Sequence, residues 1–364
     1  MDNREEMVRF IKKYRISGLK SFKKQINIVL LLVAVTILIV LESCKSPTSP
    51  KIDNTPPGRR DYTWTVDTIK IGSFTNLSRI GGSSPNDLWV IGCGGNAEEC
   101  LWHYDGQKWT SPNIYVSSSF YGIFGLKGNE VWAGDVSNRI YKYDGNWSIF
   151  KTLPLNGYKY MVTSNIWGDS PSNIYTASAL ERGDSANDYT GIIAHYDGKD
   201  WSLLNTPYIN VGFNDIRVQK STGIFIIQGL NNNNGLYLEK ILVYDNKVFK
   251  ELFSTTHLSQ LGYINGEVYM IVEQKIYKYL NNTLTLWKDF SNTLYYSGFK
   301  GRSEKDIIGF GIGKLIHYNG ENWATLLETE NLQFSDSIIF DDDYFVIAEN
   351  MTTREYYIIR GTLK

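Results

Sequence analysis

Two cysteines of the chain have a spacing that suits a disulfide. Cys93 and Cys100 stand on either side of the short segment 94–99. In an oxidising compartment, two thiols placed in this way close the intervening loop as a disulfide. The alternative is that both remain unpaired thiols. A zinc site is not expected, because the segment offers only these two thiols and His103, and a structural zinc ion takes four ligands.

Charged side chains that could perform acid–base chemistry are scattered along the chain. They are Arg79, Asp169, Asp215, Arg217, Lys300 and Asp336. No nucleophile is paired with a base, and no two carboxylates have a spacing typical of catalysis. The sequence therefore predicts no catalytic residue, no metal ligand set and no cofactor.

The third cysteine belongs to an N-terminal segment with a separate role. Eight Lys or Arg residues precede an apolar run over 28–41, which is followed by Leu41-Glu42-Ser43-Cys44. This segment resembles a bacterial lipoprotein signal peptide, in which Leu stands three residues before the cysteine and a small residue directly before it. The resemblance implies that residues 1–43 are cleaved and that Cys44 becomes a lipidated (palmitate-type) N-terminus. The alternative is an uncleaved membrane anchor, for which the apolar run is short.

A short phrase that returns seven times defines the architecture around these residues. Each copy predicts a β-hairpin in which Asp-Gly forms a two-residue turn, so that Trp109 would pair with Trp102 and Trp323 with Ile316. The copies are His103–Trp109, Tyr143–Trp147, His195–Trp201, Tyr244–Phe249, Tyr279–Trp287, His317–Trp323 and a truncated Ile358–Gly361. A self-similar period of about 40–50 residues is typical of repeat proteins, whose units stack on one another.

Two further strand-like runs precede each hairpin. The second of them reads Asp-Leu-Trp-Val over 87–90 and Glu-Val-Trp-Ala over 130–133, and turn residues precede most copies. Four strands in each of seven units predict an all-β fold, a seven-bladed β-propeller of four-stranded antiparallel blades. The last unit lacks its final strand, and we expect the segment 62–66 to supply it and close the ring.

The repeats resemble those of bacterial β-propeller lipoproteins, which read Ser-Pro-x-Asp-Ile/Val-Trp at the second strand and Tyr-Asp-Gly-x-x-Trp at the last hairpin. The resemblance covers about residues 62–364 and implies the fold, not an activity. Three parts are therefore expected: a signal peptide over 1–43, a proline-rich disordered tether over 44–61, and the propeller over 62–364. From Cys44 onward 34 acidic residues outnumber 29 basic ones without a basic stripe, which argues against a nucleic-acid partner.

One face of the ring is the expected ligand site. Loops between units and the longest loops within units share that face, and function usually resides on such loops. Tyrosines that suit stacking on sugars or anchoring peptides are candidate ligand-binding residues, although they could also simply pack between blades. They are Tyr115, Tyr158, Tyr160, Tyr208, Tyr295 and Tyr296.

These observations predict a non-catalytic binding or scaffolding module that recognises glycan or protein. Its N-terminal lipid would hold it on a membrane of the bacterial cell envelope, facing the periplasm or the cell surface. The alternatives are a polysaccharide-active hydrolase or lyase, and a lipoprotein subunit of an envelope assembly.

Overall fold

The regular elements of the described chain are all β-strands. The computed structural model describes residues 55–72, 75–94, 99–112, 119–126, 130–181, 189–233, 236–289 and 296–364, within one compact unit from Thr55 to Lys364. The expected signal peptide, Cys44 and the tether up to residue 54 lie outside the described residues. None of the described residues forms a helix long and apolar enough to cross a membrane.

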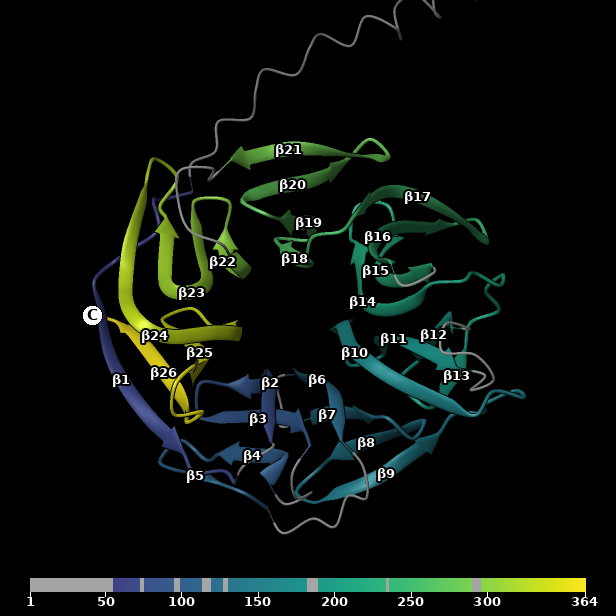
Figure 1. Ribbon diagram of the computed structural model, residues 1–364, viewed down its shortest axis with the longest axis horizontal. Coiled ribbons are helices and arrows are strands. Elements are labelled where there is room, and N and C mark those ends of the chain that lie inside the picture. Colours follow the sequence, from purple (N-terminus) through teal and green to yellow (C-terminus); the bar gives the residue numbers. More distant parts are fainter. Residues whose placement is uncertain are drawn as a thin grey trace, which may run out of the picture. The chain divides into compact units, whose positions relative to one another are not determined.

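Five antiparallel sheets of four strands each follow one another along the chain and around a ring (Figure 1). The first sheet contains β2 (Asn76–Ser84), β3 (Asp87–Cys93), β4 (Leu101–Tyr104) and β5 (Trp109–Thr110). The second contains β6 (Phe120–Leu126), β7 (Glu130–Asp135), β8 (Arg139–Tyr143) and β9 (Trp147–Thr152). The third contains β10 (Tyr160–Ser170), β11 (Asn173–Glu181), β12 (Tyr189–Tyr196) and β13 (Trp201–Leu203). The fourth contains β14 (Gly212–Gln219), β15 (Ile224–Asn233), β16 (Leu236–Asp245) and β17 (Val248–Thr255). The fifth contains β18 (Ser259–Ile264), β19 (Glu267–Val272), β20 (Lys275–Leu280) and β21 (Thr283–Asp289).

The sixth sheet has six strands and overturns the prediction of seven blades. Its strands, in spatial order, are β1 (Tyr62–Ile69), β26 (Tyr356–Leu363), β25 (Asp343–Asn350), β24 (Trp323–Ile339), β23 (Asp306–Tyr318) and β22 (Tyr296–Ser303). The described chain is therefore a six-bladed β-propeller. The last two sequence repeats, predicted as separate four-stranded blades, join into one sheet because two of its strands each span two predicted strands. The long β24 pairs with β23 near its start and with β25 over Leu332–Ile339.

The ring closes as the sequence predicts. Strand β1 pairs antiparallel with β26 along its whole length, with Trp64 opposite Gly361. The segment before β1 adds contacts of its own. The backbone N–H of Gly58 donates to the carbonyl oxygen of Lys305 at 2.8 Å, and Arg60 Nε donates to Nδ1 of His317 at 3.1 Å. The N-terminal strand thus completes the sheet that contains the C-terminal strand, and closure is confirmed.

The repeated hairpin has a different register from the predicted one. Tyr104 pairs directly with Trp109, and Tyr318 with Trp323, so that four residues rather than two form each loop. The Asp side chain explains the longer loop. Asp105 Oδ1 accepts hydrogen bonds from the backbone N–H groups of Gln107 and Lys108, both at 2.9 Å. Such an Asx turn competes with the two-residue turn, so the predicted pairing of Trp109 with Trp102 is wrong.

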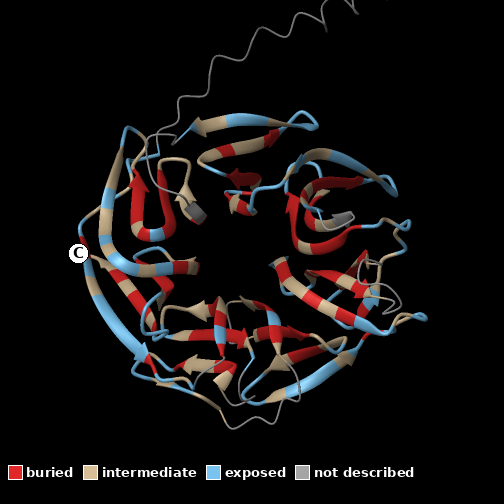
Figure 2. Ribbon diagram, viewed as in Figure 1, coloured by how far each residue is buried: buried red, intermediate tan, exposed pale blue. Residues whose placement is uncertain are grey.

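Aromatic residues of the repeated second strand and of the repeated hairpin meet between neighbouring sheets. Trp132, on the second strand of its sheet, is fully buried and lies 4.8 Å from Tyr196 and 5.5 Å from Trp201 (ring centroids) of the next sheet. Trp89 stands in the same relation to Tyr143 and Trp147, at 4.7 and 5.1 Å. Each repeat therefore presents one half of an interface to the next repeat, which is why a single unit cannot fold alone. Figure 2 shows the buried residues concentrated on inner and middle strands, with exposed ones on the outermost strands.

Candidate functional site

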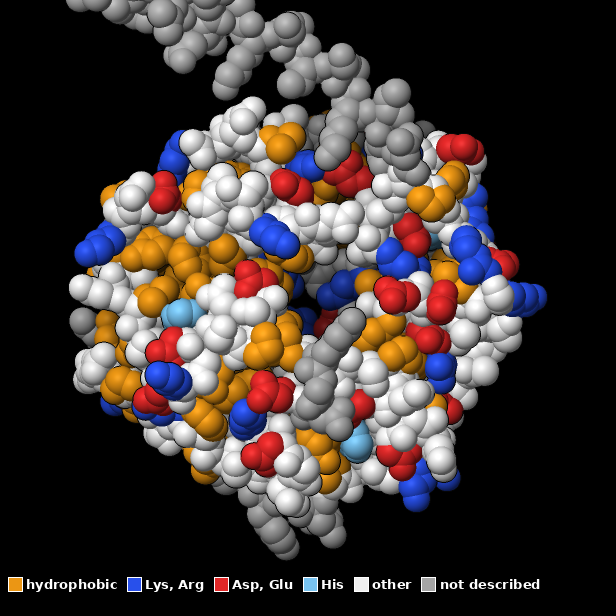
Figure 3. All heavy atoms as spheres, turned by 180° about the vertical axis from the view of Figure 1, so that it is seen from behind, with side chains coloured by type: hydrophobic (Ala, Val, Ile, Leu, Met, Phe, Trp, Pro, Cys, Tyr) orange, Lys and Arg blue, Asp and Glu red, His pale blue; other side chains and the backbone are white. Residues whose placement is uncertain are grey.

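A cavity of about 840 Å³ occupies the centre of the ring. Its wall comes from the innermost strands of all six sheets, chiefly β2, β6, β10, β14, β18, β22 and β24. The volume lies within the range of about 300–1,000 Å³ that is typical of small-molecule sites. Seen from behind, the ring also shows this central hollow, with basic side chains at its edge (Figure 3).

Six of these seven strands share a distortion that aims side chains at the cavity. In β6 and β14 the pairing with the next strand skips one residue, in β2, β10 and β22 it skips one residue at each of two places, and in β24 it skips two consecutive residues. A β-bulge of this kind leaves a residue unpaired and redirects its side chain. Skipped residues that line the cavity are Tyr121, Ser164, Asn214, Ser335 and Asp336.

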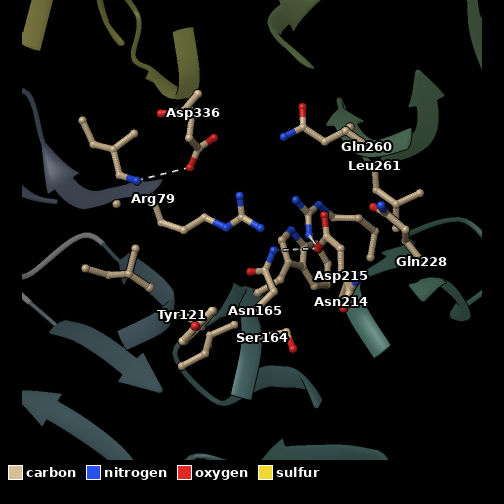
Figure 4. Close-up of a pocket in the computed structure, with 18 of the residues that line it drawn as sticks. Arg79, Tyr121, Ser164, Asn165, Asn214, Asp215, Gln228, Gln260, Leu261 and Asp336 are labelled. Atoms are coloured by element: carbon tan, nitrogen blue, oxygen red, sulfur yellow. Dashed lines mark hydrogen bonds and ion pairs between the residues drawn. The ribbon is translucent and has the colours of Figure 1, made fainter. Parts of the chain in front are cut away.

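Arg79 points into the cavity from β2, immediately after a skipped residue of that strand (Figure 4). Its Nε is buried and has no hydrogen-bond partner. No ion pair of Arg79 occurs among the described residues either. A guanidinium group that is partly removed from water is stabilised by a carboxylate or another anion, so Arg79 offers unused binding capacity.

The carboxylate of Asp336 is committed to neighbouring groups. The side chain is only 6% exposed, and its Oδ2 accepts a hydrogen bond from the backbone N–H of Ile80 at 3.2 Å. Lys300 Nζ lies 3.4 Å from Oδ1. Asp336 therefore links β24 to β2 across the boundary between two sheets, and its charge is balanced within the wall.

Asp215 has the same kind of role on the other side of the cavity. It is 6% exposed, pairs with the guanidinium of Arg217, and accepts hydrogen bonds from the Ile216 backbone N–H at 2.7 Å and from Asn165 Nδ2 at 2.8 Å. The bond from Asn165 ties β10 to β14 (Figure 4). These donors commit the oxygens of the Asp215 carboxylate to groups of the wall.

Glu239 is a third buried acid of the cavity wall. It is 8% exposed, and its Oε2 accepts hydrogen bonds from Gln228 Nε2 at 2.7 Å and Ser259 Oγ at 3.1 Å. Burial raises the pKa of the carboxyl group above its usual range, while the two hydrogen bonds oppose that shift. Both of these donors are neutral, whereas Asp215 and Asp336 each lie beside a cation.

The predicted tyrosines whose side chains the structure describes do not line the cavity. Tyr158 is half-buried and packs against a hydrophobic cluster, while Tyr160 and Tyr208 are 57% and 62% exposed. Tyr115 and Tyr295 lie outside the described residues, as does the side chain of Tyr296. Tyr160 stands at the start of β10, and Tyr208 precedes β14, so both belong to the end of the ring where the innermost strands begin.

The cavity has aromatic and apolar side chains that sequence reasoning missed. Tyr121 and Tyr189 contribute to its lining, and Leu258 is 71% exposed. These residues begin or precede strands β6, β12 and β18. Five of the six charged candidates line the cavity as well, whereas the exposed Asp169 does not and instead accepts a hydrogen bond from Asn173. Among these cavity residues, Tyr121 and Asp336 stand at bulges, which no residue type in the sequence marks.

The cysteines near β3 are both thiols in the structure. Cys100 is buried, and its Sγ lies 2.9 Å from the carbonyl oxygen of Gly94. Burial raises the pKa of the Cys100 thiol to about 11. The disulfide between Cys93 and Cys100 stays a prediction. Within the described ranges no cluster of His, Cys, Asp and Glu side chains could hold a metal ion.

The fold and its central cavity define the protein as a β-propeller. No family model matches the chain, and no curated protein matches its sequence. Solved structures similar to it include β-propellers. YCF48 bound to D1 peptide has a TM-score of 0.60 and 13% identity, covering 85% of this chain and 100% of that chain. Oligogalacturonate lyase in complex with manganese has a TM-score of 0.57 and 9% identity, covering 85% and 99%. The Cps50 (Swd1) propeller domain of Myceliophteria thermophila has a TM-score of 0.52 and 11% identity, covering 81% and 99%. At such low identity these likenesses show the fold alone.

Proposed function

We propose that this protein is a non-catalytic binding module that takes a glycan or protein ligand at the central cavity and its tyrosine-bearing end. One observation carries the proposal: the Arg79 guanidinium points into the cavity and its buried Nε has no partner, while the acids around it are held by donors. Unused donor capacity suits ligand binding. The committed carboxylates of Asp215 and Asp336 leave no free acid–base pair between them. YCF48, a structural neighbour, has been solved with a bound peptide, which agrees with a binding role for such a ring.

A variant that fills the cavity tests this site. Ser164 is skipped by the pairing of β10 and β11, so replacing it changes no strand register. Ser164→Trp should abolish binding to whichever members of a glycan and peptide array the full-length protein retains. The matched control is Ser202→Trp, since Ser202 is exposed on the outermost strand β13. If Ser164→Trp binds as the natural protein does while remaining folded, the cavity is not the site.

We also propose a lipid anchor at Cys44 on the bacterial cell envelope, facing the periplasm or the cell surface. The supporting observation is the resemblance of the segment up to Cys44 to a lipoprotein signal peptide. Cells that express the protein and are fed labelled palmitate should label it, and Cys44→Ala should remove the label. Labelling that persists in Cys44→Ala would contradict the anchor at this position.

A polysaccharide-active hydrolase or lyase is the second candidate function, and Glu239 is the observation that favours it. A carboxyl group whose pKa is raised by burial keeps its proton to a higher pH than an exposed glutamate does, and in a cavity wall it can act as a general acid. One structural neighbour is an oligogalacturonate lyase. Purified protein should then release products from a polysaccharide, and Glu239→Gln should stop the release. Binding without any product would leave the binding module as the function.

A further inference from the structure

We infer that Arg79 is the carboxylate-binding group of the cavity and that the ligand is an acidic oligosaccharide, a chain containing uronic-acid sugars. The inference rests on the proposed function, since it names the ligand class of the same site. It follows from two features of the wall: which of its charged side chains form ion pairs, and the chemistry of its uncharged side chains.

Ion pairs within the wall account for two of its three cations. Arg217 pairs with Asp215, and Lys300 lies 3.4 Å from Asp336. Arg79 alone among the cavity cations makes no ion pair with a described residue, and its buried Nε has no partner. A ligand that places one carboxylate at this guanidinium would receive two parallel N–H donors. The third acid of the wall, Glu239, is held by Gln228 and Ser259, so a carboxylate partner for Arg79 would come from the ligand.

The uncharged part of the wall matches hydroxyl groups. Short hydroxyl and carboxamide side chains line the cavity: Ser164, Asn165, Asn214, Gln228, Gln260 and Ser335. Each of them both donates and accepts, as a sugar hydroxyl does. The buried hydroxyl oxygen of Ser335 has no partner within the described residues. Figure 4 shows that those of these side chains that it labels come from different strands around the cavity, so that they would contact a ligand from more than one side.

The wall also suits a sugar ring. Its apolar and aromatic side chains include Tyr121, which is 37% exposed, and the half-buried Tyr189. A sugar ring can lie against such a face while its hydroxyls bond to the polar side chains.

Calorimetry with the full-length protein in detergent tests the inference. The probes are oligosaccharides of glucuronic, galacturonic and mannuronic acid, each with its carboxyl-reduced neutral counterpart. We expect at least one acidic oligosaccharide to bind more tightly than its neutral counterpart. Arg79→Gln should weaken that binding about tenfold to a hundredfold, because a charge-assisted pair is lost. The affinity of Arg79→Lys should lie between those of the natural protein and Arg79→Gln, since lysine keeps the positive charge without the planar guanidinium that binds a carboxylate through two N–H groups. Lys199→Gln, at an exposed hairpin position, serves as the charge-matched control and should bind as the natural protein does.

The outcomes separate this inference from the proposed function. Arg79→Gln that binds as tightly as the natural protein, equal affinity for neutral counterparts, or no binding by any acidic probe would each overturn the acidic-sugar assignment. If Ser164→Trp still blocks a peptide or neutral glycan, the cavity remains the binding site and only the ligand class is wrong. A thermal unfolding midpoint within error of the natural protein confirms that Arg79→Gln is folded.

Discussion

Arg302 Nη1 donates a 2.9 Å hydrogen bond to the hydroxyl of Tyr62, which lies 240 positions earlier in the chain. The guanidinium also lies 6.0 Å from the centre of the Tyr62 ring. Tyr62 begins the closing strand β1, and Arg302 stands near the end of β22 at the far edge of the same six-stranded sheet. The Arg302 side chain thus connects the two edge strands of this sheet, one of which, β1, closes the ring.

Truncation of Tyr62 should weaken the closure strongly. Tyr62 is 8% exposed, so Tyr62→Ala removes a buried aromatic ring and should lower the free energy of unfolding by about 3–5 kcal/mol. Tyr62→Phe, which removes only the hydroxyl, should cost about 1 kcal/mol. Denaturant unfolding measures both. Val66 on the same strand is 58% exposed, and Val66→Ala should stay within about 0.5 kcal/mol. Equal losses for Tyr62→Ala and Val66→Ala would contradict the role of Tyr62.

The contact between Trp132 and Trp201 should appear as a coupling between neighbouring sheets. Their rings meet edge to face at 5.5 Å, a geometry that contributes about 0.5–1.5 kcal/mol beyond burial. A double-mutant cycle of Trp132→Leu and Trp201→Leu should yield a coupling energy of about this size. The control cycle combines Trp132→Leu with Trp323→Leu, whose parent residues lie in different, non-adjacent sheets, and should be additive within about 0.5 kcal/mol. Equal coupling in both cycles would show that the direct contact is not its source.

Glu239 should make stability fall as the pH rises. Burial raises the pKa of this carboxyl group in the folded protein above its value in the unfolded chain, so the unfolded chain gives up the proton first. The contribution is fully present below the ordinary glutamate pKa of about 4.3 and is lost as the pH rises through the folded value. Denaturant unfolding at a series of pH values should show the loss, and Glu239→Gln should reduce it. A pH profile that is identical in the two proteins would rule out Glu239 as its origin.

Cys100 should resist alkylation near neutral pH. The thiolate is the reactive form, and the pKa of about 11 leaves little of it at neutral pH. Iodoacetamide labelling followed by mass spectrometry of peptides should show the rate at Cys100 increasing as the pH approaches that value. Fast labelling of Cys100 at neutral pH in the folded protein would contradict the buried position of its thiol.

The predicted disulfide can be tested on the same peptides. Protein isolated from the cell envelope without reductant should contain a peptide in which Cys93 and Cys100 are linked. Cys93→Ser should leave Cys100 as a thiol and remove the linked peptide. Linked peptides that are missing from protein isolated under oxidising conditions would refute the disulfide.

The sequence predicted the strands and the closure well because both depend on local signals. Turn residues and alternating apolar positions mark most strands, and the missing final strand pointed to the segment around Trp64. The predicted number of sheets was wrong, and the reason is again local. Between Trp323 and Ile339 the sequence contains neither Gly nor Pro, so the chain stays extended as the single strand β24 and joins two repeats.

The site was only partly predictable. Arg79 and Lys300 could be recognised as charges on inner strands, but a sequence pattern does not show which cation lacks a partner. The bulges decide which neighbouring residues face the cavity, and a bulge such as the one at Ser164 leaves no distinctive residue type in the sequence. Glu239 was missed because it lies on β16, outside the innermost strands.

The skipped residues of the innermost strands have a consequence for how such a ring diversifies. Asn214 and Ser164 take part in no cross-strand pair, so the strand pairing on either side does not depend on which residue occupies these positions. Substitutions at these positions can therefore change the side chains that line the cavity one at a time, while the sheets form in the same way. Relatives with this architecture could differ in ligand without differing in shape.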